Sequence, residues 1–316
     1  MHLNNIAGIA CLCVGLMFFA VQDAVLKTLV DDYSVLQLLF MRSLASAPLL
    51  AAFLLWRHGI GGFATSRPLL HLVRCLLTVT AFTCFYLAVG AVALVDVVAL
   101  FNAAPLFITA FAGPVLGERV GWRRWCAVAV GFVGVLVMLQ PGSAGFNPVV
   151  LLGLVAALSY SVSALIARTM GPAESSVLMA FFSNLTFLLV CGSSLLVLRA
   201  LRTGASFALP DIALLRPYLA PVGMDLALML CAGLITITGF VLVPRAYQLA
   251  PASVVSPFEY TYLLWALIIG MLFFDEIPNA ASLTGAALIV TAGVYIARRE
   301  ARLAPSDGVS AGPQAK

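Results

Sequence analysis

Charged residues are scarce in this chain of 316 residues. Aspartate, glutamate, lysine and arginine together make up 9% of it, whereas hydrophobic residues make up 63%. Soluble domains carry about 25% charged residues, so the composition excludes an ordinary soluble domain and indicates a protein of the lipid bilayer. The net charge is only +4, and the arginines lie in short loops. This pattern is typical of residues that set membrane orientation, and it argues against a nucleic-acid partner.

Residues and motifs typical of enzymes are also scarce. Only three histidines occur, His2, His58 and His71. The sequence contains no HExxH, GxSxG, P-loop or acidic metal-pair motif. The seven cysteines all lie in apolar stretches without a zinc-binding spacing. We therefore predict no catalytic residues, no bound metal and no cofactor, and the lack of an ATP-binding motif excludes a self-powered pump.

Long apolar runs dominate the sequence instead. A membrane span needs about 20 mostly apolar residues, so the runs predict an all-α integral membrane protein with ten transmembrane helices. These helices are expected near residues 6–28, 34–56, 71–90, 92–116, 123–139, 148–168, 176–198, 222–244, 251–274 and 279–297. The first run lacks the basic leader and cleavage site of a signal peptide, so we expect it to be retained. The polar tail, residues 301–316, is predicted to be disordered and cytoplasmic.

The basic residues predict the orientation of these spans. If the N-terminus is cytoplasmic, most of the 17 lysines and arginines fall in cytoplasmic segments. This bias is expected of a multi-pass protein of the cell inner (plasma) membrane, with both termini in the cytoplasm. The loop 199–221 is discordant, because it places three arginines outside.

An internal repeat divides the predicted helices into two sets of five. Residues 85–122 align without gaps with residues 243–280, so that Ala88 pairs with Ala246 and Glu118 with Glu276. Each aligned segment is followed by a helix rich in small residues. Because five is an odd number, the second set is inverted relative to the first. We predict repeats at 6–139 and 148–297.

These features resemble the EamA family of the drug/metabolite transporter superfamily. The resemblance rests on the ten spans, the two inverted five-helix repeats, and the acid in "LGERVGW" and "FFDEIPN" that opens the fifth helix of each repeat. The stretches "SVLQLLFMRSLAS", "NAAPLF" and "LAPASVVSPFEYT" are similar to the branch that includes S-adenosylmethionine transporters. The similarity covers roughly residues 6 to 298.

The resemblance implies a secondary transporter that works by alternating access. Its expected substrate is a small polar organic metabolite, amino-acid-like or cofactor-like, such as S-adenosylmethionine or riboflavin. A channel-like facilitator and an integral-membrane enzyme are the alternatives. Whether the chain forms a homodimer is left open.

Polar side chains within the predicted spans are the candidate substrate-binding residues. An ionisable group at membrane depth is costly and is expected to face other helices or water. The candidates are Gln22, Asp23, Arg42, Tyr86, Asn102, Tyr160, Glu259, Tyr260, Tyr262 and Trp265. We expect the first, third, fourth, sixth, eighth and ninth spans to line a central cavity, with the fifth and tenth spans at the periphery.

Three charged candidates have alternative interpretations. Asp23 and Lys27 are four residues apart and can pair on one helical face, either within the site or as an ion pair that anchors the outer end of the span. Arg42 can extend to the outer interface, or it can pair with Asp23, with Glu259 or with a substrate carboxylate. Of these alternatives we expect a structural pairing of Arg42.

Two prolines predict interrupted helices. Pro105 leaves the carbonyl of Phe101 without its helical donor, next to Asn102, which either lines the site or bonds to a neighbouring helix. Pro257 does the same for Ser253. Glu259 follows Pro257 roughly eight residues into its span, an unfavourable depth for a carboxylate.

The surroundings of Glu259 decide how it is interpreted. Tyr260, Tyr262 and Trp265 follow it on the same span, and such a set suits a polar organic solute with an apolar part. The alternative is a structural acid bonded to another helix.

Small and acidic residues near the fifth and tenth spans have predicted structural roles. Four glycines are expected to allow close helix packing: Gly131, Gly134, Gly285 and Gly293. Glu118 and Glu276 are expected to cap the helices that follow them.

Overall fold

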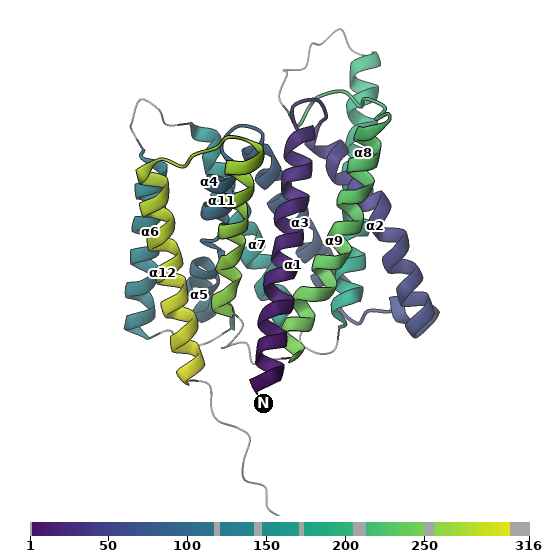
Figure 1. Cartoon of the computed structure of the whole chain (residues 1–316). Helices are drawn as coiled ribbons and strands as arrows, with labels where there is room; N and C mark the ends of the chain where they lie inside the picture. Colours follow the sequence, from purple (N-terminus) through teal and green to yellow (C-terminus); the bar gives the residue numbers. More distant parts are fainter. Residues whose placement is uncertain are drawn as a thin grey trace, which may run out of the picture.

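The computed structural model describes residues 2–116, 121–141, 147–170, 174–204, 213–249 and 256–303. Within these ranges the chain is helical and contains no β-strand. The helices run side by side in one bundle, and the N-terminus and the end of the last helix lie at the same end of it (Figure 1). We call this end of the bundle the N-terminal end, and we call the other one the opposite end. The predicted orientation places the N-terminal end in the cytoplasm.

The helices of the first half of the chain are α1 (His2–Leu29), α2 (Val35–His58), α3 (Pro68–Val89), α4 (Leu94–Phe101), α5 (Ala104–Leu116) and α6 (Trp122–Leu139). A short 3-10 helix, η1 (Ile60–Phe63), lies between α2 and α3. The second half contains η2 (Pro148–Val150), α7 (Leu151–Met170), α8 (Ser176–Gly204), α9 (Met224–Leu249), η4 (Ser256–Tyr260), α11 (Thr261–Phe273) and α12 (Ala280–Leu303). Their bounds lie within a few residues of the predicted runs, except where a helix is interrupted.

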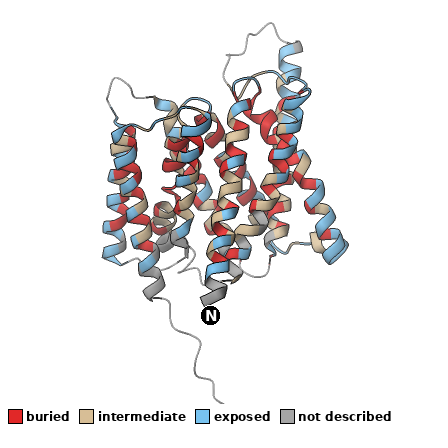
Figure 2. Ribbon diagram, viewed as in Figure 1, coloured by how far each residue is buried: buried red, intermediate tan, exposed pale blue. Residues whose placement is uncertain are grey.

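The helices have the length and composition of membrane spans. Six segments are long and apolar enough to cross a membrane: Ile6–Leu29, Val35–His58, Pro68–Val89, Leu94–Phe111, Pro148–Ala167 and Val177–Arg202. Four shorter apolar helices accompany them, at Trp125–Leu139, Met224–Gly239, Phe258–Phe273 and Ala280–Ile296. Exposed residues follow the outer sides of the bundle (Figure 2), and large apolar side chains such as Leu196 and Phe273 are among them. This surface suits the hydrocarbon of a bilayer, so the chain is a multi-pass membrane protein.

The predicted interruption at Pro105 is confirmed. α4 ends at Phe101 and α5 begins at Ala104, so Pro105 lies in the first turn of a new helix, where its missing N–H is tolerated. The side-chain amide of Asn102 donates to the carbonyl oxygen of Val98 at 2.9 Å. Asn102 therefore bonds within its own helix rather than to a neighbouring one.

The second predicted interruption is only partly covered by the structure. Ser253 lies outside the described residues, so its carbonyl is not tested. Glu259 lies in η4, a 3-10 helix that leads directly into α11. It is half-buried there, and the 3-10 geometry agrees with the interruption predicted at Pro257.

Contacts between the two halves follow a reciprocal pattern. α1 packs along α9, and α7 packs along α3, so the first helix of each half contacts the third helix of the other. α1 also contacts α11, and α7 also contacts α4 and α5. α2 pairs with α8, and α6 pairs with α12. The pair formed by α6 and α12 lies at one side of the bundle (Figure 1).

Two of the predicted packing glycines meet in the α6–α12 pair. A Cβ atom added to Gly134 would lie 2.7 Å from the carbonyl oxygen of Gly285, and one added to Gly285 would lie 2.5 Å from that of Gly134. Real Cβ contacts essentially never fall below 3.0 Å. The expectation that these two glycines allow close helix packing is therefore confirmed.

Candidate functional site

A buried polar network lies where α1, α3, α9 and α11 meet. α1 contributes two consecutive residues, Gln22 and Asp23, which are 1% and 3% exposed. Tyr86 of α3 and Thr236 of α9 are also buried, and Tyr262 of α11 packs against the same core. Because neighbouring side chains on a helix point about 100° apart, Gln22 and Asp23 can contact different helices from the same turn of α1. The network therefore joins helices of both halves of the chain.

The Asp23 carboxylate is the centre of this network. The hydroxyl of Tyr86 donates to its Oδ1 at 2.6 Å, and the hydroxyl of Tyr262 donates to its Oδ2. Gln22 Nε2 donates to the Tyr86 hydroxyl oxygen at 3.0 Å, and Thr236 donates to Gln22 Oε1. Hydrogen bonds to an ionised carboxylate are stronger than neutral ones, and they offset part of the cost of burying the acid.

The predicted pairing of Asp23 with Lys27 is wrong. Lys27 instead forms an ion pair with Glu276, which lies in the segment between α11 and α12. Asp23 is held one helical turn deeper by two tyrosines, and Lys27 lies where Glu276 can reach it. A contact between distant segments has thus replaced the local pair.

Glu276 caps a helix, but not the predicted one. Its Oε2 accepts the backbone N–H of Leu94, the first residue of α4, at 2.8 Å. The start of α12 is capped by Asn279, whose side-chain oxygen accepts the N–H of Ser282 at 2.8 Å. Glu276 therefore stabilises the start of a helix in the other half of the chain. Glu118, its predicted counterpart, lies outside the described residues.

A pocket of about 410 Å³ lies at the opposite end of the bundle. Its lining includes Lys27 and Asp31 of the α1 region, Val89 at the end of α3, and Phe274 and Glu276. Lys27 is four residues from Asp23, which corresponds to about 6 Å along a helix. The lining residue Lys27 therefore lies about one helical turn along α1 from Asp23.

Arg42 of α2 is buried near this network. It is 2% exposed, so it does not extend to the interface. Its guanidinium lies 5.1 Å from the ring centre of Phe82 and 5.0 Å from that of Phe187. No ion pair joins Arg42 to a carboxylate in the described part of the chain. The expected structural pairing of Arg42 with Asp23 or Glu259 is therefore not formed.

Among the residues that the structure describes, the remaining predicted site residues form no hydrogen bond with Asp23. Tyr160 of α7 is 39% exposed, packs on Phe101 with ring centres 5.1 Å apart, and is close enough to Glu259 for electrostatic interaction. Tyr260 packs against Gly293 of α12. Trp265 packs against the core that contains Tyr86.

The structure thus brings four of the ten predicted residues into direct contact, namely Gln22, Asp23, Tyr86 and Tyr262. Thr236 belongs to the same network, although it was not among the ten candidates. The sequence feature that points to Thr236 is its position in the middle of an apolar span. Many threonines at such positions serve only in helix packing, so the feature is not specific.

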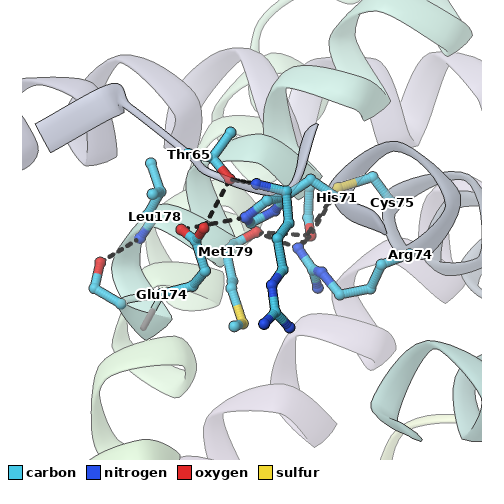
Figure 3. A network of polar contacts seen from close by, with 10 residues as sticks. Thr65, His71, Arg74, Cys75, Glu174, Leu178 and Met179 are labelled. Carbon is cyan, nitrogen blue, oxygen red and sulfur yellow. Dashed lines mark hydrogen bonds and ion pairs between the residues drawn. The ribbon is translucent and has the colours of Figure 1, made fainter. Parts of the chain in front are cut away.

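A second polar cluster lies at the N-terminal end of the bundle (Figure 3). The hydroxyl of Thr65 donates to Glu174 Oε1 at 2.7 Å, and His71 Nε2 lies 3.5 Å from Glu174 Oε2. Arg74 donates to the carbonyl oxygen of Met179 at 2.6 Å. Burial raises the pKa of Glu174, but hydrogen bonds from Thr65 and His71 outweigh it, so the pKa lies below its usual value. This cluster ties the loop before α3 to the start of α8.

The comparison with protein families identifies the class of this protein. The profile of the EamA-like transporter family matches residues 6–140 and again residues 147–298. The chain therefore belongs to the EamA-like transporter family, as the sequence motifs indicated.

Individual relatives have names that agree with this family. The chain is 33% identical over 246 residues to a riboflavin transporter of Rhizobium johnstonii, covering 78% of this chain and 76% of the relative. It is 27% identical over 291 residues to an S-adenosylmethionine uptake transporter of Rickettsia prowazekii, covering 92% of each. A solved crystal structure superimposes with a TM-score of 0.59 at 15% identity, covering 94% of this chain and 99% of its own. At this identity the likeness shows the fold alone.

Proposed function

We propose that this protein is a secondary transporter that carries a small polar metabolite through the Asp23 network by alternating access. The substrate is amino-acid-like or cofactor-like, with S-adenosylmethionine and riboflavin as the candidates that its relatives' names supply. The membrane is the cell inner membrane, with both termini in the cytoplasm. The relatives are named transporters, so neither an enzyme nor a channel-like facilitator is favoured.

The proposed framework is ten spans in two inverted repeats, at residues 6–139 and 148–297. The reciprocal contacts support this layout, because α1 on α9 and α7 on α3 are equivalent pairs under a two-fold axis. The two separate matches of the family profile support it as well. In such an arrangement the substrate site lies at the interface of the repeats, near the middle of the membrane.

The single observation that carries the proposal is that a buried carboxylate is shared by both halves. Asp23 belongs to the first half, and one of its two oxygens is bound by Tyr262 of the second half. A ligand with its own hydrogen-bond donors can replace these hydroxyls, so its binding alters the contact between the halves. We place the route from the opposite end of the bundle at the pocket that Lys27 and Glu276 line.

The substitution Asp23→Asn tests this assignment. Asparagine keeps the shape of the side chain but removes its negative charge. Hydrogen bonds to a charged acceptor are about twice as strong as neutral ones, so the substitution weakens the hydrogen bonds that position 23 accepts. We expect saturable counterflow of S-adenosylmethionine or riboflavin in proteoliposomes to fall at least about tenfold, since tenfold corresponds to about 1.4 kcal/mol.

The matched control is Asp32→Asn, the same chemical change at an exposed position on the turn after α1. It should leave counterflow unchanged. If Asp23→Asn protein of normal yield and monodispersity transports as fast as the wild type, the network is structural and the assignment is wrong.

A further inference from the structure

Arg42 is a buried cation without an acidic partner. Its guanidinium donates no hydrogen bond to any residue that the structure describes, and its Nε atom is fully buried. Arginine stays protonated in proteins and presents five donors in a fixed plane. A buried polar group without a partner is unusual and calls for an explanation.

The aromatic rings beside Arg42 do not supply that explanation. Phe82 and Phe187 lie about equally far from the guanidinium, at 5.1 and 5.0 Å. Cation–π contacts contribute about 0.5–2 kcal/mol each. Burying an ion costs several kcal/mol even after the surroundings relax. The two rings contact the guanidinium but leave its buried Nε–H without an acceptor.

Asp23 is close to Arg42 but is bound to other groups. The ring centre of Phe82 lies 5.1 Å from the Arg42 guanidinium and 6.4 Å from the ring centre of Tyr86, which donates to Asp23. Arg42 and Asp23 nevertheless form no ion pair. One carboxylate oxygen accepts from Tyr86 and the other from Tyr262. A fixed anion and a fixed cation therefore lie in the same buried region without neutralising each other directly.

This arrangement fits a ligand that carries both charges. A carboxylate accepts two parallel hydrogen bonds from a guanidinium, which is the strongest neutralisation available to Arg42. An ammonium group on the same ligand would be attracted to Asp23, which retains free lone pairs beyond those used by the tyrosines.

We propose that Arg42 binds the carboxylate of the transported solute, and that the substrate class is therefore a zwitterion with an α-amino-acid head group. This inference rests on the proposed transport function and narrows it. S-adenosylmethionine carries an α-ammonium and an α-carboxylate group, whereas riboflavin has neither. The inference thus favours the first of the two candidate substrates.

The direct test compares two ligands that differ only in the carboxylate. Binding of S-adenosylmethionine and of decarboxylated S-adenosylmethionine is measured by calorimetry on the purified full-length wild-type protein. Hydrogen bonds to charged groups contribute about 1.5–3 kcal/mol, so we expect the decarboxylated ligand to bind at least about tenfold more weakly. Because this comparison needs no variant, a folding defect cannot obscure it.

Substitution of Arg42 should remove the preference for S-adenosylmethionine over its decarboxylated form. In Arg42→Met, the affinity for S-adenosylmethionine should fall to that of the decarboxylated ligand, whose own affinity should change little. Arg42→Lys keeps the charge but cannot form two parallel bonds, so an intermediate preference is expected.

The possible failures are distinguishable. Equal binding of the two ligands by the wild type, or wild-type uptake of riboflavin that Arg42→Met leaves unchanged, would overturn the role of Arg42 while transport itself stands. If none of the three solutes binds or enters proteoliposomes, the proposed transport function is contradicted together with this inference.

Discussion

The contact between Gly134 and Gly285 offers a quantitative test of how α6 and α12 pack. Ordinary van der Waals contact of a Cβ atom begins at 3.4 Å, whereas a Cβ on Gly134 would lie 2.7 Å from the Gly285 carbonyl oxygen. In Gly134→Ala the two backbones must therefore part by about 0.7 Å, because the obstructing atom belongs to the backbone and cannot rotate away. Overpacking of this kind costs about 1–3 kcal/mol.

The higher helix propensity of alanine stabilises Gly134→Ala and so opposes the cost of the clash. A control variant with a glycine-to-alanine change but no clash is therefore needed. Alanine is favoured over glycine by about 1 kcal/mol in a helix interior. Gly153→Ala, in the first turn of α7, gains helix propensity without the clash, because the nearest atom to its Cβ is Leu100 Cβ at 3.4 Å. The free energy of unfolding of Gly134→Ala should therefore lie about 1–3 kcal/mol below that of Gly153→Ala.

The measurement is equilibrium unfolding of each variant by SDS in mixed micelles. The double variant Gly134→Ala/Gly285→Ala adds a second check, because the first substitution has already separated the helices. We expect the combined cost to be smaller than the sum of the single costs, which is the sign of direct coupling. Strictly additive costs, or a Gly134→Ala protein as stable as Gly153→Ala, would refute the packing described here.

Three further predictions concern acidic residues. Glu276→Ala should destabilise the protein more than Glu276→Gln in thermal denaturation, because glutamine loses the ion pair with Lys27 but keeps an acceptor that caps α4. The advantage of wild type over Glu174→Gln should be constant at neutral pH and shrink below about pH 4.5, because a lowered pKa contributes stability that is lost as the folded-state carboxylate becomes protonated; a pH series of melting temperatures measures this. Glu259→Gln should fold and express normally but strongly reduce flux or change its pH dependence; wild-type flux with an unchanged pH profile would show that Glu259 is structural.

The helices were predictable from the sequence because the bilayer imposes a strict rule. A chain in hydrocarbon must satisfy its backbone groups within each span, so an apolar run becomes a helix of nearly the same length. The runs at 34–56 and 123–139 accordingly appear as α2 (Val35–His58) and α6 (Trp122–Leu139). The interruption near Pro105 was predictable for an equally local reason, since proline lacks the N–H that a continuous helix requires.

The partners of the buried polar residues were not predictable in the same way. Asp23 was predicted as a candidate site residue, with Lys27, four residues away, as a possible partner. The observed partners, Tyr86 and Tyr262, lie 63 and 239 residues away in the sequence. A pair four residues apart on a helix contributes only about 0.2–0.5 kcal/mol, so tertiary contacts readily replace it. The positions of polar residues can be read from one sequence, but their pairing depends on how the helices assemble.

The contacts between distant segments also differ in how easily they can change. Asp23–Tyr262 and Lys27–Glu276 each join α1 to the second half of the chain, and both are polar contacts that water or a ligand can replace. The contact of Gly134 with Gly285 is steric, and it has no polar group that a ligand could satisfy instead. Alternating access requires the two halves to rearrange around the substrate. That rearrangement should therefore break contacts along α1 before it separates α6 from α12.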